Sequence, residues 1–297
     1  MSKKHYHVIL NPASGSGISR EILNTVRPDL EKEQISITVH ESEDAGHSVE
    51  LARALDLDGA DGIITIGGDG TLHEVINGLM TREDGKKVPV GAIPGGSGNS
   101  FLYGLDIKTP ADGVQALRRG MTRKIDIARV SFDGQILYSF NIIGWGLVVD
   151  IEMSSERFRW WPKQRYNLAT ILELITLKSR HTNLVLDGVE TDLDVAFLIA
   201  CNTPYTGVGM KMAPRADLQD GLIDLVIVKE ATRLQMLKLF PKVFDGSHIE
   251  SDLVDYRQVS AFGLIPDEEA VINIDGELNA HTPLKVEMIP QGIEILV

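Results

Sequence analysis

Residues 67–71 (GGDGT) combine three glycines with one carboxylate, a set of residue types suited to phosphate chemistry. Glycine lets backbone N–H groups approach a ligand closely, and the N-terminus of a following helix favours negative charge. Because Asp69 would repel a bare phosphate, we expect its carboxylate to act with a magnesium ion or as a base facing a substrate hydroxyl. The alternative is a tight turn in which Asp69 caps a helix.

The flanking residues supply the elements that would position this segment. Residues 62–66 (GIITI) form the short apolar, β-branched run that is typical of a buried parallel strand. Apolar residues then recur at helical spacing from Leu72 to Leu79, and Thr71 and Glu74 have the spacing of a capping box. The sequence therefore predicts a strand, a glycine-rich turn and a helix whose start is marked by this capping box.

The same order of strand, loop and helix occurs at two other places. Residues 7–10 and 88–93 read as strands, and they are followed by the small-residue loops 11–17 and 94–100. With a further strand over residues 34–40, the pattern predicts a doubly wound parallel sheet, whose ligands lie at the carboxyl ends of the strands. We therefore expect the three loops to converge on one nucleotide-phosphate site.

The second part of the chain has a different texture. Short strand candidates are separated by turn signals such as 133–134 (DG) and 291–292 (QG), which predicts an antiparallel β-sandwich. We expect a nucleotide-binding α/β domain over residues 1–123 and a β-rich substrate domain over 124–289. The last strand, near 290–297, is expected to pack back on the first domain, and the active site to lie in the cleft between the two domains.

The composition excludes several classes of protein. The formal charge of −13 argues against a nucleic-acid binder, because such proteins cluster Lys and Arg against phosphates. The single cysteine, Cys201, lies in an apolar run, where we expect a buried hydrophobe in a reducing compartment. No run approaches the roughly 18 apolar residues that span a bilayer, and residues 1–6 show no apolar signal region. We expect a cytoplasmic protein.

Four motifs resemble those of the diacylglycerol kinase and sphingosine kinase family of lipid kinases. They are residues 11–15 (NPASG), 67–71 (GGDGT), 94–99 (PGGSGN) and 274–277 (IDGE), in the family's order over nearly the whole chain. The resemblance implies an enzyme that uses ATP and Mg²⁺ to phosphorylate the primary hydroxyl of a lipid. The lipid would be a sphingoid long-chain base or a diacylglycerol, and features such as His73 lean toward the sphingosine and ceramide kinase branch.

The resemblance also implies which residues bind the nucleotide. Among them, Arg159 and Arg165 would clamp the phosphates, because planar guanidinium groups suit bidentate contacts. Without the resemblance, these two arginines would be read as part of a solvated surface run and His73 as a helix-face residue. The implied set is Asn11, Pro12, Ala13, Ser14, Gly15, Ser42, Gly67, Gly68, Asp69, Gly70, Thr71, Leu72, His73, Gly96, Ser97, Arg159 and Arg165.

Three carboxylates are implied at the chemistry. In the sphingosine kinase scheme Asp69 accepts the proton of the lipid hydroxyl, whereas the bacterial diacylglycerol kinase scheme uses Asp275 and Glu277. The residues themselves leave this choice open, and residues 275–276 (DG) alone would be a hairpin turn.

Metal and head-group sites follow from the same resemblance. Residues 217–222 (DLQDGL) resemble a structural magnesium loop of the bacterial members, which implies a site at Asp217, Asp220 and Leu222 with Asp220 the one side-chain ligand. Asp220 and the following glycine alone would be a turn. Asp150 or Glu152 would read the lipid head group. The branch has Asp at the position of Glu152, so the identity of the lipid stays open.

Residues 166–178 are an unusually apolar helix candidate beside Trp160 and Trp161. We expect this helix, with the basic residues around it such as Arg159 and Arg165, to form the lipid entrance and to make transient contact with the membrane surface. Packing of the helix on the sheet as part of the core is the alternative. Two other functions stay open: an NAD kinase-like nucleotide-cofactor kinase, since such kinases also carry GGDG, and a catalytically silent lipid-binding pseudokinase. Whether the chain forms a homodimer is also left open.

Overall fold

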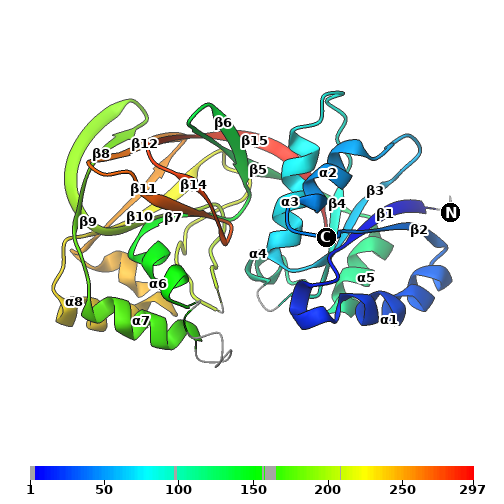
Figure 1. Ribbon diagram of the computed structural model, residues 1–297, viewed down its shortest axis with the longest axis horizontal. Coiled ribbons are helices and arrows are strands. Elements are labelled where there is room, and N and C mark those ends of the chain that lie inside the picture. Colours follow the sequence, from blue (N-terminus) through cyan, green and yellow to red (C-terminus); the bar gives the residue numbers. More distant parts are fainter. Residues whose placement is uncertain (1–3, 97–98, 156, 158–164, 208) are drawn as a thin grey trace. The chain divides into compact units, whose positions relative to one another are not determined.

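The computed structural model describes residues 4–96, 99–155, 157, 165–207 and 209–297. The chain splits into two compact units (Figure 1), the first comprising residues up to Ile127 together with Pro290–Val297 and the second Ala128–Ile289. Each unit has a hydrophobic core of its own. Two long strands, β5 (Thr122–Phe132) and β15 (Leu284–Leu296), run from one unit into the other.

A parallel sheet forms the centre of the first unit. Its strands are β1 (Lys4–Leu10), β2 (Ile35–Glu41), β3 (Gly62–Gly67) and β4 (Val90–Pro94), in the order β2-β1-β3-β4. The C-terminal part of β15 adds to β4 in parallel, through Ile295 opposite Val90. Every residue of β3 is buried, as its apolar run predicts for a central parallel strand.

Helices cover both faces of this sheet, which confirms the predicted doubly wound α/β fold. Figure 1 shows α1 (Ser19–Lys32) and α5 (Pro110–Arg119) on one face, and α2 (His47–Ala54) and α3 (Asp69–Met80) on the other. The short helices η1 (Ser14–Gly17) and α4 (Ser100–Gly104) lie in the loops that follow β1 and β4. The apolar stripe of α1 packs into the sheet because its buried residues recur at helical spacing.

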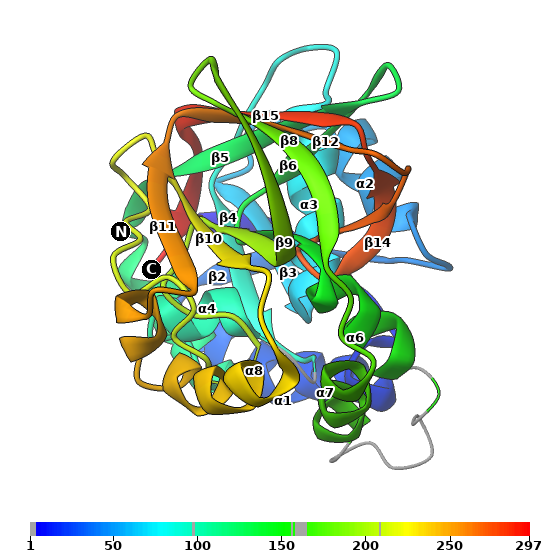
Figure 2. The ribbon, with the colours of Figure 1, turned by 90° about the vertical axis from the view of Figure 1, so that its left-hand side faces the viewer.

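The second unit is built on antiparallel strands and confirms the predicted β-sandwich. One core lies among its strands, and another lies between strands and helices; Figure 2 shows α6, α7 and α8 gathered on one side of the strands. Its elements are β6 (Gln135–Ser139), β7 (Ile142–Gly146), α6 (Leu147–Ser155), α7 (Arg165–Ile175), β8 (Arg180–Leu186), β9 (Val189–Cys201), β10 (Ile223–Lys229), α8 (Arg233–Leu239), η3 (Phe240–Val243), η4 (Ser247–Glu250), β11 (Val254–Val259), β12 (Ala261–Pro266), β13 (Val271–Ile274) and β14 (Glu277–His281).

One predicted turn is present and one is absent. Residues 133–134 join β5 to β6, with positive φ angles of 42° and 73°. Residues 291–292 do not end a strand, because β15 continues through them. Gln291 instead takes a positive φ of 51°, and its N–H donates to the buried carboxylate of Asp126 at 2.7 Å. The Gln-Gly pattern at residues 291–292 therefore accompanies a long-range hydrogen bond and not a turn.

The capping box predicted for Thr71 and Glu74 is wrong. Helix α3 begins at Asp69, with Gly68 as its N-cap and no side-chain capping bond, so Glu74 lies inside the helix. The Glu74 carboxylate instead accepts hydrogen bonds from the N–H groups of Gly46 and Ser48, at 2.9 and 3.2 Å. These N–H groups belong to the start of α2, so Glu74 caps the neighbouring helix rather than its own.

Within the described part of the chain, no helix is both long enough and apolar enough to cross a lipid bilayer.

Cys201 is fully buried, which confirms its predicted role as a small hydrophobe. Burial raises the pKa of its thiol, with a further contribution from the charge of nearby Asp224.

Candidate functional site

The three glycine-rich loops of the first unit meet at the carboxyl ends of β1, β3 and β4. The Gly68 N–H donates to Ser14 Oγ at 3.0 Å, and the Gly95 N–H donates to the Gly67 carbonyl at 2.8 Å. A Cβ atom on Gly15 would lie only 1.9 Å from the Gly95 carbonyl oxygen. Each loop therefore touches the other two, and the loops converge as predicted.

The strand order explains why these loops converge. β1 lies between β2 and β3, so the chain winds away from β1 in two opposite directions. In such sheets, ligands bind outside the carboxyl ends of the strands where the winding direction changes. The loops after β1 and β3 flank this point, and the N-terminus of the 12-residue helix α3 opens beside them. The first N–H groups of a helix point out of its N-terminus, which makes this end a favourable site for a phosphate.

Asp69 is held between two of the loops. Its Oδ2 atom accepts hydrogen bonds from the Ser100 N–H at 2.8 Å and from the Ser100 hydroxyl at 2.9 Å. As the first residue of α3, its carboxylate is also stabilised by the positive end of the helix dipole. Asp69 is therefore an oriented, half-buried carboxylate beside the loop amides.

The remaining residues of the implied nucleotide set are placed in two ways. The Asn11 side chain accepts the Ala13 N–H at 2.9 Å, and the Ser42 N–H donates to the end of β1, so both lie at this edge of the sheet. Pro12, Gly70 and Gly96 are half-buried loop or helix-start residues. In contrast, Thr71, Leu72 and His73 are buried within α3, so their side chains support packing and are not exposed to a ligand.

Some of the predicted residues cannot be placed in this way. Ser97 and Arg159 lie outside the described residues, as do Trp160 and Trp161 beside the predicted lipid entrance. Arg165 is the first residue of α7.

In the second unit, Asp275 and Gly276 form the turn of the β13–β14 hairpin, with positive φ angles of 55° and 99°. This is the structure that the Asp-Gly signal alone predicts. The turn places Glu277 at the first position of β14, where its side chain is exposed.

The Asp275 carboxylate is buried and anchors a neighbouring corner of the chain. It accepts hydrogen bonds from the Ser139 hydroxyl at 2.7 Å and from the N–H groups of residues 140–142 at 2.9–3.2 Å. A carboxylate with this many donors is held in place by the fold. Of the two carboxylates at this turn, that of Glu277 is exposed and that of Asp275 is buried.

The predicted head-group residues lie on α6. Both carboxylate oxygens of Asp150 accept hydrogen bonds from Arg180 Nη2, at 2.9 and 2.7 Å, and the two side chains are partly buried. Glu152 follows on the same helix and is half-buried. The negative charge of Asp150 is therefore already compensated by a neighbouring guanidinium.

The predicted metal residues lie in an exposed loop before β10. The carboxylates of Asp217 and Asp220 accept the N–H groups of residues 219 and 222, at 3.0 and 2.9 Å. Burial raises the pKa of nearby Asp224 and the charge of Asp220 raises it further, while hydrogen bonds from Tyr256 and Gln258 and the charge of Arg215 lower it. Among the described residues, no three His, Cys, Asp or Glu side chains are arranged around one ion, so a cation at Asp220 would need backbone carbonyl ligands.

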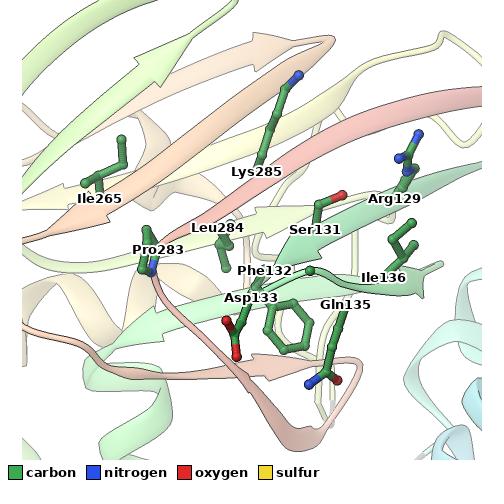
Figure 3. Close-up of a pocket in the computed structure, with 11 residues that line it drawn as sticks. Arg129, Ser131, Phe132, Asp133, Gln135, Ile136, Ile265, Pro283, Leu284 and Lys285 are labelled. Carbon is green, nitrogen blue, oxygen red and sulfur yellow. The ribbon is translucent and has the colours of Figure 1, made fainter.

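A cavity of about 500 Å³ opens elsewhere in the second unit, between the β5–β6 hairpin and β15 (Figure 3). Arg129 and Lys285 contribute cations to its lining, and Phe132 and Leu284 contribute apolar surface. None of the predicted site residues lines it. The size of this cavity therefore does not identify it as the reaction site.

Sequence reasoning missed the roles of two residues that the structure links to the predicted site. Ser100 holds Asp69, and Arg180 compensates Asp150. Ser100 could have been found from its place after a glycine-rich loop, since Ser is common at helix starts. Arg180 gave no local signal, because it lies 30 positions from its partner.

Comparisons with known proteins agree with this geometry. Residues 5–130 match the family model of the diacylglycerol kinase catalytic domain, and residues 141–297 match that of the YegS C-terminal NAD kinase beta sandwich-like domain. Sphingosine kinase 1 of Arabidopsis thaliana is 30% identical, over 92% of this chain and 68% of that protein. A diacylglycerol kinase of Mycobacterium tuberculosis is 28% identical, over 97% of this chain and 93% of that protein.

A solved structure has the same fold. The crystal structure of a diacylglycerol kinase from Bacillus anthracis superposes with a TM-score of 0.74 and 19% identity, over 99% of this chain and 96% of that one. Both family models match this chain, one after the other along its length. This chain therefore belongs to the lipid kinase family that includes the diacylglycerol kinases and the sphingosine kinases.

Proposed function

We propose that this protein transfers the γ-phosphoryl group of ATP to the primary hydroxyl of a lipid alcohol. The observation that carries the proposal is the meeting of three glycine-rich loops at the N-terminus of α3, with Asp69 held among them. Membership of a lipid kinase family supports a lipid as the acceptor.

Phosphoryl transfer demands positioning and charge stabilisation more than covalent chemistry by the protein. The loop amides and the first N–H groups of α3 would bind phosphate oxygens, and Arg159 and Arg165 would be the clamps that the family resemblance implies. A magnesium ion, when bound, neutralises part of the triphosphate charge. Carboxylates are ionised at neutral pH, so Asp69 or Glu277 needs only correct placement to accept the hydroxyl proton.

The test compares the isosteric substitutions Asp69→Asn, Asp275→Asn and Glu277→Gln in an assay with labelled ATP and extracted lipid products. Asp69→Asn is expected to abolish phosphorylation while sparing ATP binding, because it removes the proton acceptor and keeps the size of the side chain. Asp275→Asn is expected to lower the melting temperature, because its buried carboxylate anchors residues 139–142. Circular dichroism melting of each variant separates loss of fold from loss of chemistry.

Two outcomes would change the proposal. Retained activity in Asp69→Asn together with lost activity in a folded Glu277→Gln variant would transfer the role of base to Glu277. Absence of phosphorylation for every lipid, with ATP still bound, would favour the catalytically silent lipid-binding alternative.

The lipid class is proposed from the pairing of Asp150. Because Arg180 already compensates this carboxylate, an amine-bearing head group would gain little from it. We therefore expect diacylglycerol, monoacylglycerol or ceramide to be phosphorylated faster than sphingosine when the four are compared side by side. A preference for sphingosine would contradict this, and phosphorylation of NAD would favour the nucleotide-cofactor alternative.

A further inference from the structure

Helix α8, the 3-10 helix η3 and the following Phe244 form a short segment, residues 233–244, that has both buried and exposed apolar side chains. Met236, Leu239 and Val243 are buried in the core that also contains Leu174 of α7. A capping box between Thr232 and Gln235 fixes the start of the segment. The inward face is thus fully used, and its packing determines which residues point outward.

The outward face carries large apolar side chains in water. Leu234, Leu237 and Phe244 are 62%, 52% and 51% exposed. Leu234 and Leu237 are three positions apart in the helix, and the Phe244 ring packs edge-on against Phe240 at 5.8 Å. Of the twelve large hydrophobic residues that are exposed in the described part of the chain, three lie within the eleven positions from Leu234 to Phe244. Clustered exposed apolar residues are typical of interaction surfaces, whereas single exposed ones are normal on any soluble protein.

The charges of this segment differ from those of the chain as a whole. Arg233, Lys238 and Lys242 are exposed, and residues 233–244 contain no Asp or Glu, although the chain carries a formal charge of −13. The next residue, Asp245, turns its carboxylate to the Ser247 N–H at 2.8 Å. Apolar side chains flanked by cations are complementary to an anionic lipid surface, which attracts the cations and accepts the apolar groups.

The surface adjoins the helix with the predicted lipid entrance. α8 packs on α7 within the second unit, and Figure 2 shows the two helices side by side. We propose that Leu234, Leu237 and Phe244, with Arg233, Lys238 and Lys242, form a surface that docks on an anionic bilayer and brings α7 to the lipid. The inference rests on the proposed function, because a lipid substrate has to be reached at the surface of the bilayer.

The experiment measures co-sedimentation of the full chain with vesicles of phosphatidylcholine, with and without phosphatidylglycerol, in the absence of ATP. Leu234→Gln/Leu237→Gln is expected to weaken binding by roughly tenfold or more. The matched control Met121→Gln/Val189→Gln removes two apolar side chains of similar exposure, 61% and 66%, and is expected to bind as the wild type does. Lys238→Glu/Lys242→Glu is expected to remove the preference for anionic vesicles, while Lys32→Glu/Lys108→Glu, with the same charge change, keeps it.

Several results would overturn the proposal. These are no vesicle binding by the wild type, equal loss in the control variants, or a wild-type dimer that Leu234→Gln/Leu237→Gln converts to a monomer without changing vesicle binding. A second measurement, kinase activity on lipid in detergent micelles, tests the proposed function without a bilayer. It therefore distinguishes failure of the docking surface from failure of the proposed function. Lost vesicle binding with retained micelle activity supports the docking surface, and selective vesicle binding without any kinase activity overturns the enzyme assignment alone.

Discussion

At the scale of single residues, Gly15 shows how a missing side chain lets two loops touch. It has a positive φ of 59°, and an added Cβ would lie 1.9 Å from the Gly95 carbonyl oxygen. Gly17, two positions later, also has a positive φ, 90°, but its Cβ would meet nothing closer than Pro12 O at 3.9 Å. Both positions would strain the backbone of a residue with a side chain, but only Gly15 also lies in close contact with another loop. Substitutions at the two glycines therefore distinguish the effect of strain from the effect of the close contact.

Gly15→Ala is expected to weaken ATP binding by roughly tenfold or more, because the clash moves the first loop away from the third and misplaces the amides. Gly17→Ala carries a similar backbone strain without the clash and serves as the control. Isothermal titration with Mg-ATP measures both. Equal affinities in the two variants would mean that the contact between the loops is not needed for nucleotide binding.

At the scale of elements, α2 and α3 are joined by a side chain as well as by packing. Glu74 on α3 caps the start of α2 through two N–H groups. The same helices approach closely at Gly78, where a Cβ would lie 2.5 Å from the Val49 carbonyl oxygen. The start of α2 therefore depends on a residue from another helix, because its own N-cap, Gly46, has no side chain.

Glu74→Ala is expected to lower the free energy of unfolding by about 1 kcal/mol, the usual effect of removing a helix cap. Glu74→Gln retains one acceptor oxygen and should lose less. Urea denaturation measures both, and Glu50→Ala, an exposed acidic residue in the first turn of α2, is the control. A loss in Glu50→Ala as large as in Glu74→Ala would assign the effect to charge at the helix start rather than to the cap.

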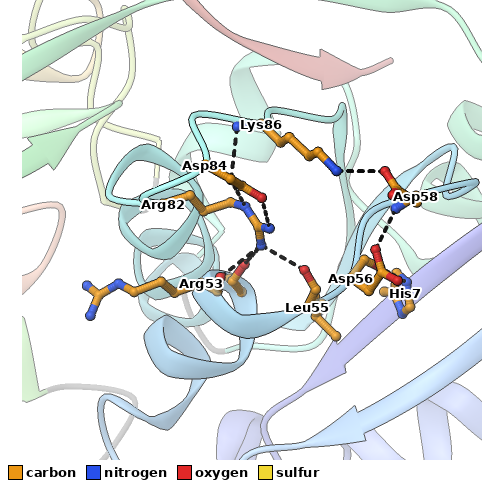
Figure 4. Close-up of polar contacts among 9 residues, drawn as sticks. His7, Arg53, Leu55, Asp56, Asp58, Arg82, Asp84 and Lys86 are labelled. Atoms are coloured by element: carbon orange, nitrogen blue, oxygen red, sulfur yellow. Dashed lines mark hydrogen bonds and ion pairs between the residues drawn. The ribbon is translucent and has the colours of Figure 1, made fainter.

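The stability of the whole molecule depends on pH through a polar network. This network joins the C-terminus of α2 to the loop after α3 (Figure 4). Arg82 donates to the carbonyls of residues 52, 53 and 55 and pairs with Asp84 at 2.6 Å. Chiefly because Arg82 donates to it, and also through the Lys86 N–H, the pKa of Asp84 falls from 3.8 to about 2. Since the ionised form is favoured in the folded state, its stabilisation is complete above about pH 4 and is lost as pH falls toward 2.

Asp84→Asn is accordingly expected to destabilise the protein at neutral pH, and the difference from the wild type should shrink as the pH falls from 4 to 2. Unfolding curves recorded at several pH values test this. Asp58→Asn removes the partner of Lys86 at a site where the Asp58 side chain is 76% exposed, and should change stability little. A difference between Asp84→Asn and wild type that is constant with pH would contradict the lowered pKa.

Local patterns were enough to predict the strands that carry the three glycine-rich loops, the two fold classes and the edge of the sheet where the loops meet. Each of these follows from short-range patterns: apolar periodicity, glycine-rich turns, and the rule that ligands lie at the carboxyl ends of parallel strands. The partners of individual polar side chains, in contrast, could be seen only in the folded chain. Asp275 anchors residues 139–142, Glu74 caps another helix, and Asp150 pairs with Arg180. These partners are 26 to 136 positions apart, and a side chain's hydrogen bonds depend on what folding brings beside it, which local spacing does not encode.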